Sequence, residues 1–276
     1  MSGLRASLAF RVGGALCGVV PGAPMTATPQ TARTHRRKAL PRSRFYLALP
    51  PIMIAMAVIG FWPQYYGRLL RGQALEGPAV HPLVHVHSSL FVGWLLIIFA
   101  QVALVHAGRT DVHRRLGPWL AGVGYAAALV GLVSGLNLAA ARVTRGGALD
   151  EAAVFVAAPI LDMIAFTSFL TAAVLYRRRP ELHKRLILFT GYCFAFIGLV
   201  RYLGRIPGVL ENLWLGTLLF VVPILACIGW EAVTRRSVHP VWWAGLAAFT
   251  ARLLIELLAM LPPWLPVGRA ILRPFV

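Results

Sequence analysis

The strongest constraint in this sequence is a set of long apolar stretches that contain few or no charged side chains. The clearest lies between Ser89 and His106. With its apolar flanks it has about the length that an α-helix needs to cross a ~30 Å hydrocarbon core. Seven such segments follow one another, at 45–62, 83–105, 116–141, 152–176, 186–203, 213–232 and 241–261. The sequence therefore predicts an all-α fold, a polytopic membrane helix bundle of about seven transmembrane helices.

The composition supports the membrane class and argues against a nucleic-acid partner. The chain is 58% hydrophobic and only 13% charged, more apolar surface than a soluble domain can bury. A net charge of +18 would suggest nucleic acid in a soluble protein. Here the basic residues lie mostly between apolar stretches, where the positive-inside rule accounts for them. The lipid bilayer is thus the expected partner.

The distribution of lysine and arginine predicts the orientation. Loops 106–115, 177–185 and 233–240 carry three, five and two basic residues, against two, two and one in the alternate loops. The N-terminal region is also basic, so the N-terminus should be cytoplasmic and the C-terminus outside. We therefore expect a multi-pass protein of the bacterial plasma (inner) membrane. Its cytoplasmic basic turns should contact anionic lipid headgroups.

Outside the bundle, the sequence predicts two short terminal regions. Residues 1–43 contain no acidic side chain and should form a basic, disordered tail. In an alternative interpretation residues 1–24 are an upstream extension of the protein, and Met25 is its true start. Residues 44–264 then form the transmembrane bundle, and residues 265–276 a short C-terminal tail. None of the three cysteines forms a CxxC motif, which argues against a thiolate metal site.

A repeated motif indicates how the bundle is built. Residues 109–116 (RTDVHRRL) and 179–186 (RPELHKRL) share the pattern R-x-[DE]-[VL]-H-[RK]-R-L, and each precedes an apolar span. This pattern predicts a repeated two-helix unit. We expect spans two–three and four–five to be related by pseudo-symmetry, with their two basic turns close together.

Four ionisable residues inside apolar spans are candidates for a catalytic site. They are Asp162, Arg201, Arg252 and Glu256. Such groups are costly in a bilayer and often functional. The alternative is a structural polar core, in which Arg252 and Glu256 form an ordinary i,i+4 pair. On either reading Asp162 should be paired with Arg201 or His87. Arg252 is the runner-up partner, because it already has Glu256 on its own helix.

Two groups of histidines are candidates for metal or cofactor binding. His81, His85 and His87 form HxxxHxH at the start of the second span, and imidazoles four residues apart are a familiar divalent-metal spacing. Interfacial histidines without any ligand are the alternative. A bis-histidine haem b needs one histidine from each of two helices. On the predicted cytoplasmic side His113, His183, His106 and His239 could supply them, and His113 and His183 are the named candidates. All four lie at helix ends in basic turns, where capping and headgroup contacts are also expected.

Several of these residues carry a resemblance to a group of proteins. The chain resembles uncharacterised bacterial multi-spanning integral membrane proteins over roughly residues 45–205. The shared features are HxH, Trp94, Gln101, HRRLG (113–117), Asp162, RRRPELHKRL (177–186) and Arg201. The resemblance implies a membrane protein of bacterial origin. It implies no particular reaction, cofactor or substrate.

The sequence leaves three functions open. One is a metal- or haem-dependent membrane enzyme that uses His85 or His87 with Asp162. Another is a small-solute or proton-coupled transporter, in which the four intramembrane ionisable residues line a path. The third is a structural or assembly-helper membrane protein. The oligomeric state is also left open.

Overall fold

The computed structural model describes residues 44–75, 81–209 and 213–276, and within these ranges every regular element is a helix. The predicted basic tail, 1–43, lies outside the described residues. Six helical segments of the described part are long and apolar enough to cross a membrane. They are Arg44–Leu70, Pro82–His106, Thr110–Thr144, Leu149–Leu175, Pro180–Leu203 and Pro240–Leu258. The predicted all-α, multi-spanning bundle is confirmed.

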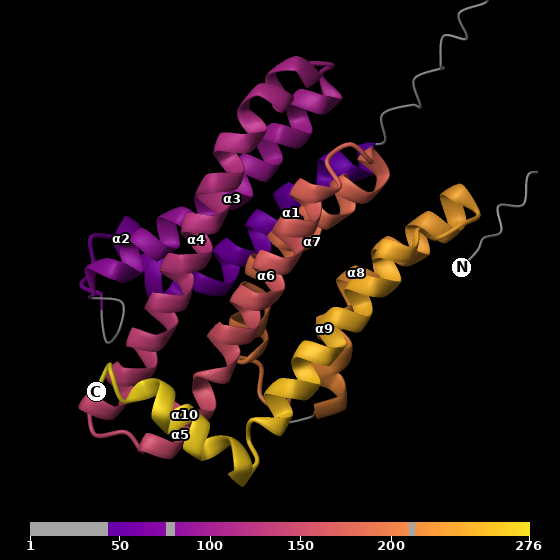
Figure 1. Cartoon of the computed structure of the whole chain (residues 1–276). Helices are drawn as coiled ribbons and strands as arrows, with labels where there is room; N and C mark the ends of the chain where they lie inside the picture. The colour runs from indigo at the N-terminus through magenta and orange to yellow at the C-terminus, as the bar shows by residue number, and fades with distance from the viewer. Residues whose placement is uncertain (1–43, 76–80, 210–212) are drawn as a thin grey trace, which may run out of the picture. The chain divides into compact units, whose positions relative to one another are not determined.

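The helices follow the predicted spans closely, with a few differences in their limits (Figure 1). The order is α1 (Arg44–Phe61), a π-helical turn η1 (Trp62–Tyr66), α2 (Gly67–Leu70), α3 (Pro82–His106), α4 (Thr110–Thr144), α5 (Leu149–Phe155), α6 (Ala157–Leu175), α7 (Pro180–Leu203), α8 (Leu213–Arg235), α9 (Pro240–Leu258), η3 (Pro262–Trp264) and α10 (Leu265–Leu272). Helix α8 occupies the segment predicted as the sixth of the seven spans. The predicted fourth span is divided between α5 and α6.

Proline marks where three of the long helices begin. Helices α3, α7 and α9 each start with proline, whose missing N–H costs nothing in the first turn. His81 caps α3 and His239 caps α9, each accepting a bond from the backbone N–H two residues on. The two capped helices, α3 and α9, each start one residue before the apolar stretch that predicted them.

Helix α7 lies at the centre of the packing. It contacts α1, α3, α6, α8 and α9. Stacked aromatic rings join it to its neighbours: Phe194 of α7 lies 3.8 Å from Phe91 of α3 and 4.6 Å from Phe166 of α6, between ring centroids. The other long helices bury much less of their length and expose large apolar side chains, as lipid-facing helices should.

Glycines allow α1 and α7 to cross backbone to backbone. A Cβ added at Gly198 would lie 2.5 Å from the carbonyl oxygen of Met56 and 2.6 Å from the Cα of Ala57. The backbone of α1 cannot move aside as the tip of a side chain can. A side chain at Gly198 would therefore push α1 and α7 apart. Small residues at such crossings are typical of membrane bundles.

We therefore expect Gly198→Ala to lower the free energy of unfolding by about 1–3 kcal/mol, the usual cost of overpacking. The measurement is unfolding of the detergent-solubilised protein by added SDS. Gly93→Ala is the matched control, because Gly93 of α3 has open space where a Cβ would lie. A Gly198→Ala variant as stable as Gly93→Ala would contradict the close crossing.

Three of the turns between successive helices lie at one end of the bundle, here called the basic end (Figure 1). It comprises turns 107–109, 176–179 and 236–239. The rings of His113 and His183 are 6.1 Å apart between centroids, which confirms that the two repeated turns lie close together. Helices α3 and α4 form one hairpin and α6 and α7 the other, and α4 packs on α6. Pseudo-symmetry between the hairpins stays a prediction.

The predicted C-terminal tail is largely helical. Helix α10 packs against α5, where the indole N–H of Trp264 donates to the Ala153 carbonyl at 2.8 Å. Arg269 of α10 donates to Asp150 of α5 at 2.6 Å. The two short helices form a small layer at the end of the bundle opposite the basic end (Figure 1).

Candidate functional site

Three of the four predicted intramembrane site residues meet in one buried cluster, here called the ion triplet: Asp162, Arg252 and Glu256. Asp162 comes from α6, and the other two from α9. The Arg252 Nε donates to Asp162 Oδ1 at 2.8 Å, and its Nη1 donates to Glu256 Oε2. Asp162 and Arg252 expose 9% and 7% of their surface, whereas the Glu256 side chain exposes 28%. The cluster is thus closed on the α6 side and partly open at Glu256.

The surroundings of the ion triplet are apolar and aromatic. The guanidinium carbon of Arg252 lies 5.1 Å from the centre of the Phe196 ring of α7, a cation–π distance. Phe249, one turn before Arg252 on α9, is buried and packs edge-on against Tyr192 at 4.9 Å. In such low-dielectric surroundings the two carboxylates depend on the single guanidinium for charge compensation.

The prediction that Asp162 is paired is confirmed, but the predicted partner is wrong. The partner is Arg252, and neither Arg201 nor His87 bonds to Asp162. Arg252 ranks second from the sequence because Glu256, four residues away on the same helix, can already satisfy it. A guanidinium has five N–H donors in a planar fork, so one arginine can serve a carboxylate on its own helix and another across the interface.

Arg201 lies apart from the ion triplet. It is exposed near the end of α7, where it donates to Gln64 Oε1 at 3.5 Å. Its guanidinium carbon also lies 4.7 Å from the centre of the Phe61 ring. Arg201 therefore contacts the α1–η1 segment, and the structure does not bring it together with the other three candidates.

The three histidines at the start of α3 have separate environments. His81 caps the helix, His85 Nδ1 shares a 2.7 Å hydrogen bond with the Tyr65 hydroxyl, and the His87 ring lies 3.9 Å from that of Phe91. The described part of the chain has no group of three or more His, Cys, Asp or Glu residues that could hold a metal ion. The predicted divalent-metal site on these histidines is not supported by this geometry.

The two histidines of the repeated turns do lie together. His183 donates from Nδ1 to the carbonyl of Ala173 at 2.8 Å, a bond that ties the start of α7 to the end of α6. Because a carbonyl can only accept, Nδ1 carries the proton in this bond, and in the neutral ring the lone pair is on Nε2 of His183. Among the described residues, His113 Nδ1 and Gln101 Oε1 are buried without a hydrogen-bond partner. This histidine pair is the second polar site of the bundle.

The sequence reasoning missed a buried ion pair at the basic end, between Arg185 of α7 and Glu231 of α8. Their side chains expose 1% and 0%. Arg185 donates to Glu231 Oε1 from both Nε and Nη2. The Tyr46 hydroxyl of α1 donates to the same carboxylate at 2.7 Å, and the backbone N–H of His239 donates at 3.0 Å. Glu231 therefore joins α1, α7 and the α8–α9 turn.

A second carboxylate extends this network toward the surface. Glu181 accepts from Arg185 at 2.9 Å, from Lys184 at 2.7 Å and from Arg235 at 3.0 Å. Together with Glu231 and Tyr46 these residues form what we name the basic-end network. The sequence held a usable signal, because Glu231 is the one acidic residue of the predicted span 213–232 and Arg185 belongs to the repeated motif.

In comparisons with known proteins, no family model matches the chain, and no curated protein or solved structure is significantly similar to it.

Proposed function

We propose that this protein is a proton-coupled carrier of a small solute, with the ion triplet as its proton-binding site. The observation that carries the proposal is one guanidinium shared by two carboxylates within an apolar bundle. With both carboxylates ionised the ion triplet has a net charge of −1, and one bound proton makes it neutral. A neutral cluster is strongly favoured away from water. The ion triplet is therefore suited to binding and releasing a single proton.

The exposure of the two carboxylates suggests how that proton would be exchanged. Asp162 is buried against α9, whereas Glu256 is partly exposed on the same guanidinium. Protonation of Glu256 would weaken its bond to Arg252 and leave the guanidinium fully paired with Asp162. In one state Arg252 is paired with both carboxylates, and in the other it is paired with Asp162 alone. Helices α6 and α9 then have two arrangements, and proton binding sets the population of each.

The basic-end network supports a carrier over a purely structural protein. Alternating access requires contacts that close each end of the bundle in turn. The ion triplet joins α6 to α9, and the basic-end network joins α1, α7 and α8. Between them, the rings of Phe169, Phe189 and Phe249 pack within 6.0 Å of one another. Two ionic clusters separated by a packed aromatic layer could serve as the two closing contacts, or gates, of such a carrier.

Proteoliposomes that contain a pH-sensitive dye test the proposal. Pools of amino acids, sugars, organic acids and inorganic cations are added outside, and the change in internal pH is recorded. At least one pool should drive proton movement with the wild-type protein and not with empty liposomes. Asp162→Asn and Glu256→Gln should each abolish that movement while the protein stays folded. The remaining carboxylate and Arg252 are neutral together without a bound proton, so binding one would leave a buried positive charge.

Arg201→Gln is the matched control, because Arg201 is a membrane-helix arginine outside the ion triplet. It should retain most of the proton movement. Wild-type protein that responds to none of the pools, or an Asp162→Asn variant with unchanged flux, would rule out the carrier with this site.

A haem-dependent membrane enzyme is the second candidate, and the histidine pair favours it. His113 and His183 come from two helices, their rings are 6.1 Å apart, and the carbonyl bond of His183 orients its ring as a ligand's would be. A bound haem would supply electron transfer, with these two histidines as its axial ligands.

Optical absorption of protein expressed with excess haem separates the two candidates. Haem held by the histidine pair predicts a Soret band that disappears in His113→Ala and His183→Ala, and persists in His106→Ala. Protein without such a band would exclude this second candidate and leave the carrier proposal untouched.

We also propose that the basic end faces the cytoplasm of a bacterial cell and contacts anionic lipid. The excess of lysine and arginine in its turns supports this orientation. Reporter fusions after Arg236 should then read as cytoplasmic, and fusions after Leu203 as external. The reverse pattern would overturn the orientation.

A further inference from the structure

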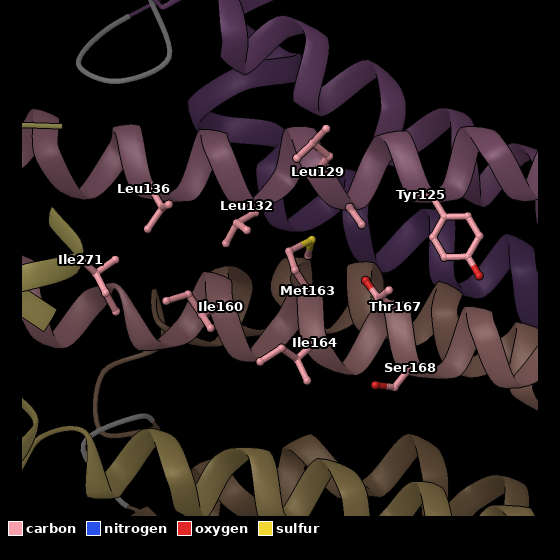
Figure 2. Close-up of a pocket in the computed structure, with 11 residues that line it drawn as sticks. Tyr125, Leu129, Leu132, Leu136, Ile160, Met163, Ile164, Thr167, Ser168 and Ile271 are labelled. Carbon is pink, nitrogen blue, oxygen red and sulfur yellow. The ribbon is translucent and has the colours of Figure 1, made fainter. Parts of the chain in front are cut away.

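A groove runs between α4 and α6 on the side of the bundle (Figure 2). Its volume is about 700 Å³, within the range of small-molecule sites. Apolar side chains form most of its walls, among them Leu129, Leu132, Ile160 and Met163. Ile271 of α10 lines the groove as well. The groove is thus an apolar, laterally open space bordered by two membrane helices.

Hydroxyl groups lie at one end of this apolar groove. Tyr125 of α4 and Thr167 and Ser168 of α6 line it, and Figure 2 shows the hydroxyl of Thr167 directed toward α4. The Tyr125 hydroxyl shares a 3.0 Å hydrogen bond with Thr171. Helix hydroxyls commonly bond to a preceding carbonyl, as Thr234 does with Trp230. Among the described residues, Thr167 and Ser168 have no such bond, so both can still donate and accept.

The depth of these hydroxyls is unusual for polar groups on a lipid-facing side. Ser168 lies about two turns before the end of α6 at Leu175, roughly 10 Å along the helix axis. We take the basic turn after Leu175 as the boundary of the hydrocarbon, whose leaflet is about 15 Å thick, and this places Ser168 well inside it. An unsatisfied hydroxyl in hydrocarbon is costly. A ligand that brings hydrogen-bond acceptors to this depth would satisfy these hydroxyls.

The depth and the length of the groove distinguish between three candidate occupants: a phospholipid, a partner helix and a lipid with a polar ring. The ester carbonyls of a diacyl phospholipid lie at the boundary of the hydrocarbon, too shallow to reach Ser168. A partner transmembrane helix would pack along the full ~30 Å of hydrocarbon. The groove from Tyr125 to Leu136 covers only about 16 Å of α4. A lipid whose polar ring lies among the acyl chains satisfies both the depth and the length.

We propose that this groove binds an isoprenoid quinone. The isoprenoid chain lies along the apolar walls toward Leu136 and Ile271. The ring carbonyls accept hydrogen bonds from the hydroxyls of Thr167, Ser168 and Tyr125. The site lies between α4 and α6, away from the α6–α9 contact that forms the ion triplet, so the proposal does not rest on the proposed function.

The test is equilibrium binding of decylubiquinone to the full chain in nanodiscs of synthetic phosphatidylcholine. Bound quinone is extracted and measured by ultraviolet absorption, and empty nanodiscs give the partitioning background. Wild-type protein should bind about one quinone per chain in a saturable manner. The double variant Thr167→Val/Ser168→Ala should bind at least about tenfold more weakly, the effect of losing two ordinary hydrogen bonds.

Two further variants make the outcome decisive. Ile164→Trp fills the groove from an exposed position of α6 and should abolish saturable binding. Ser89→Ala makes a hydroxyl deletion at an exposed position of α3 and should leave binding unchanged. Binding that never exceeds the empty-nanodisc background would overturn the proposal. So would saturable binding that survives both the double variant and Ile164→Trp.

Discussion

Arg185→Met should destabilise the folded protein by about 3–5 kcal/mol, the usual cost of removing one partner of a buried ion pair. Arg185 is the cation that contacts Glu231, whose side chain has no exposed surface. Without it, the Glu231 carboxylate would lose this cation and keep neutral donors such as the Tyr46 hydroxyl and the His239 N–H. The measurement is SDS-induced unfolding of the detergent-solubilised protein. The loss should also loosen α1 and the α8–α9 turn, which Glu231 connects to α7.

The repeated motif supplies a matched control for this change. Arg115 occupies in the first repeat the position that Arg185 occupies in the second, and it is exposed. Arg115→Met should change stability by no more than about 0.5 kcal/mol, as surface changes usually do. The double variant Arg185→Met/Glu231→Leu should recover much of the loss, because no unpaired charge is left buried. Equal effects of Arg185→Met and Arg115→Met would contradict the network.

Arg252→Met should be the second most damaging change, with a loss of about 2.5–3.5 kcal/mol, the insertion cost of one carboxylate at mid-membrane. It removes the one guanidinium that bonds to both Asp162 and Glu256. Asp162→Asn should cost less, because Arg252 then still has Glu256. Unfolding measurements on the three single variants should therefore rank Arg252→Met above Asp162→Asn, and that above Glu256→Gln.

A double-mutant cycle isolates the pairing across the helices. The coupling energy between Asp162 and Arg252 should be significant, within the 0.5–3 kcal/mol typical of contacting residues. The same cycle between Asp162 and Arg201 should give a value near zero. A larger coupling to Arg201 than to Arg252 would refute the arrangement of the ion triplet and restore the partner predicted from depth alone.

Much of the architecture could be predicted from the sequence because membrane helices are dictated by local composition. A backbone in hydrocarbon must satisfy its own hydrogen bonds, so an apolar stretch of sufficient length has little choice but to be a helix. The exceptions have local causes. Helix α4 extends beyond its predicted span of 116–141, because residues 110–115 of the repeated motif form its first turns. Helix α10 forms in the predicted tail because α5 supplies partners for Trp264 and Arg269.

The sequence by itself determined which residues were costly to bury, and the tertiary structure decided how each was paired. Asp162, Arg252 and Glu256 could be singled out because charges inside apolar spans demand compensation. The choice of Arg252 over Arg201, and the pairing of Arg185 with Glu231, depended on which faces of α6, α7, α8 and α9 meet. Those contacts follow from packing of side chains from helices far apart in the chain. No spacing along one helix specifies them.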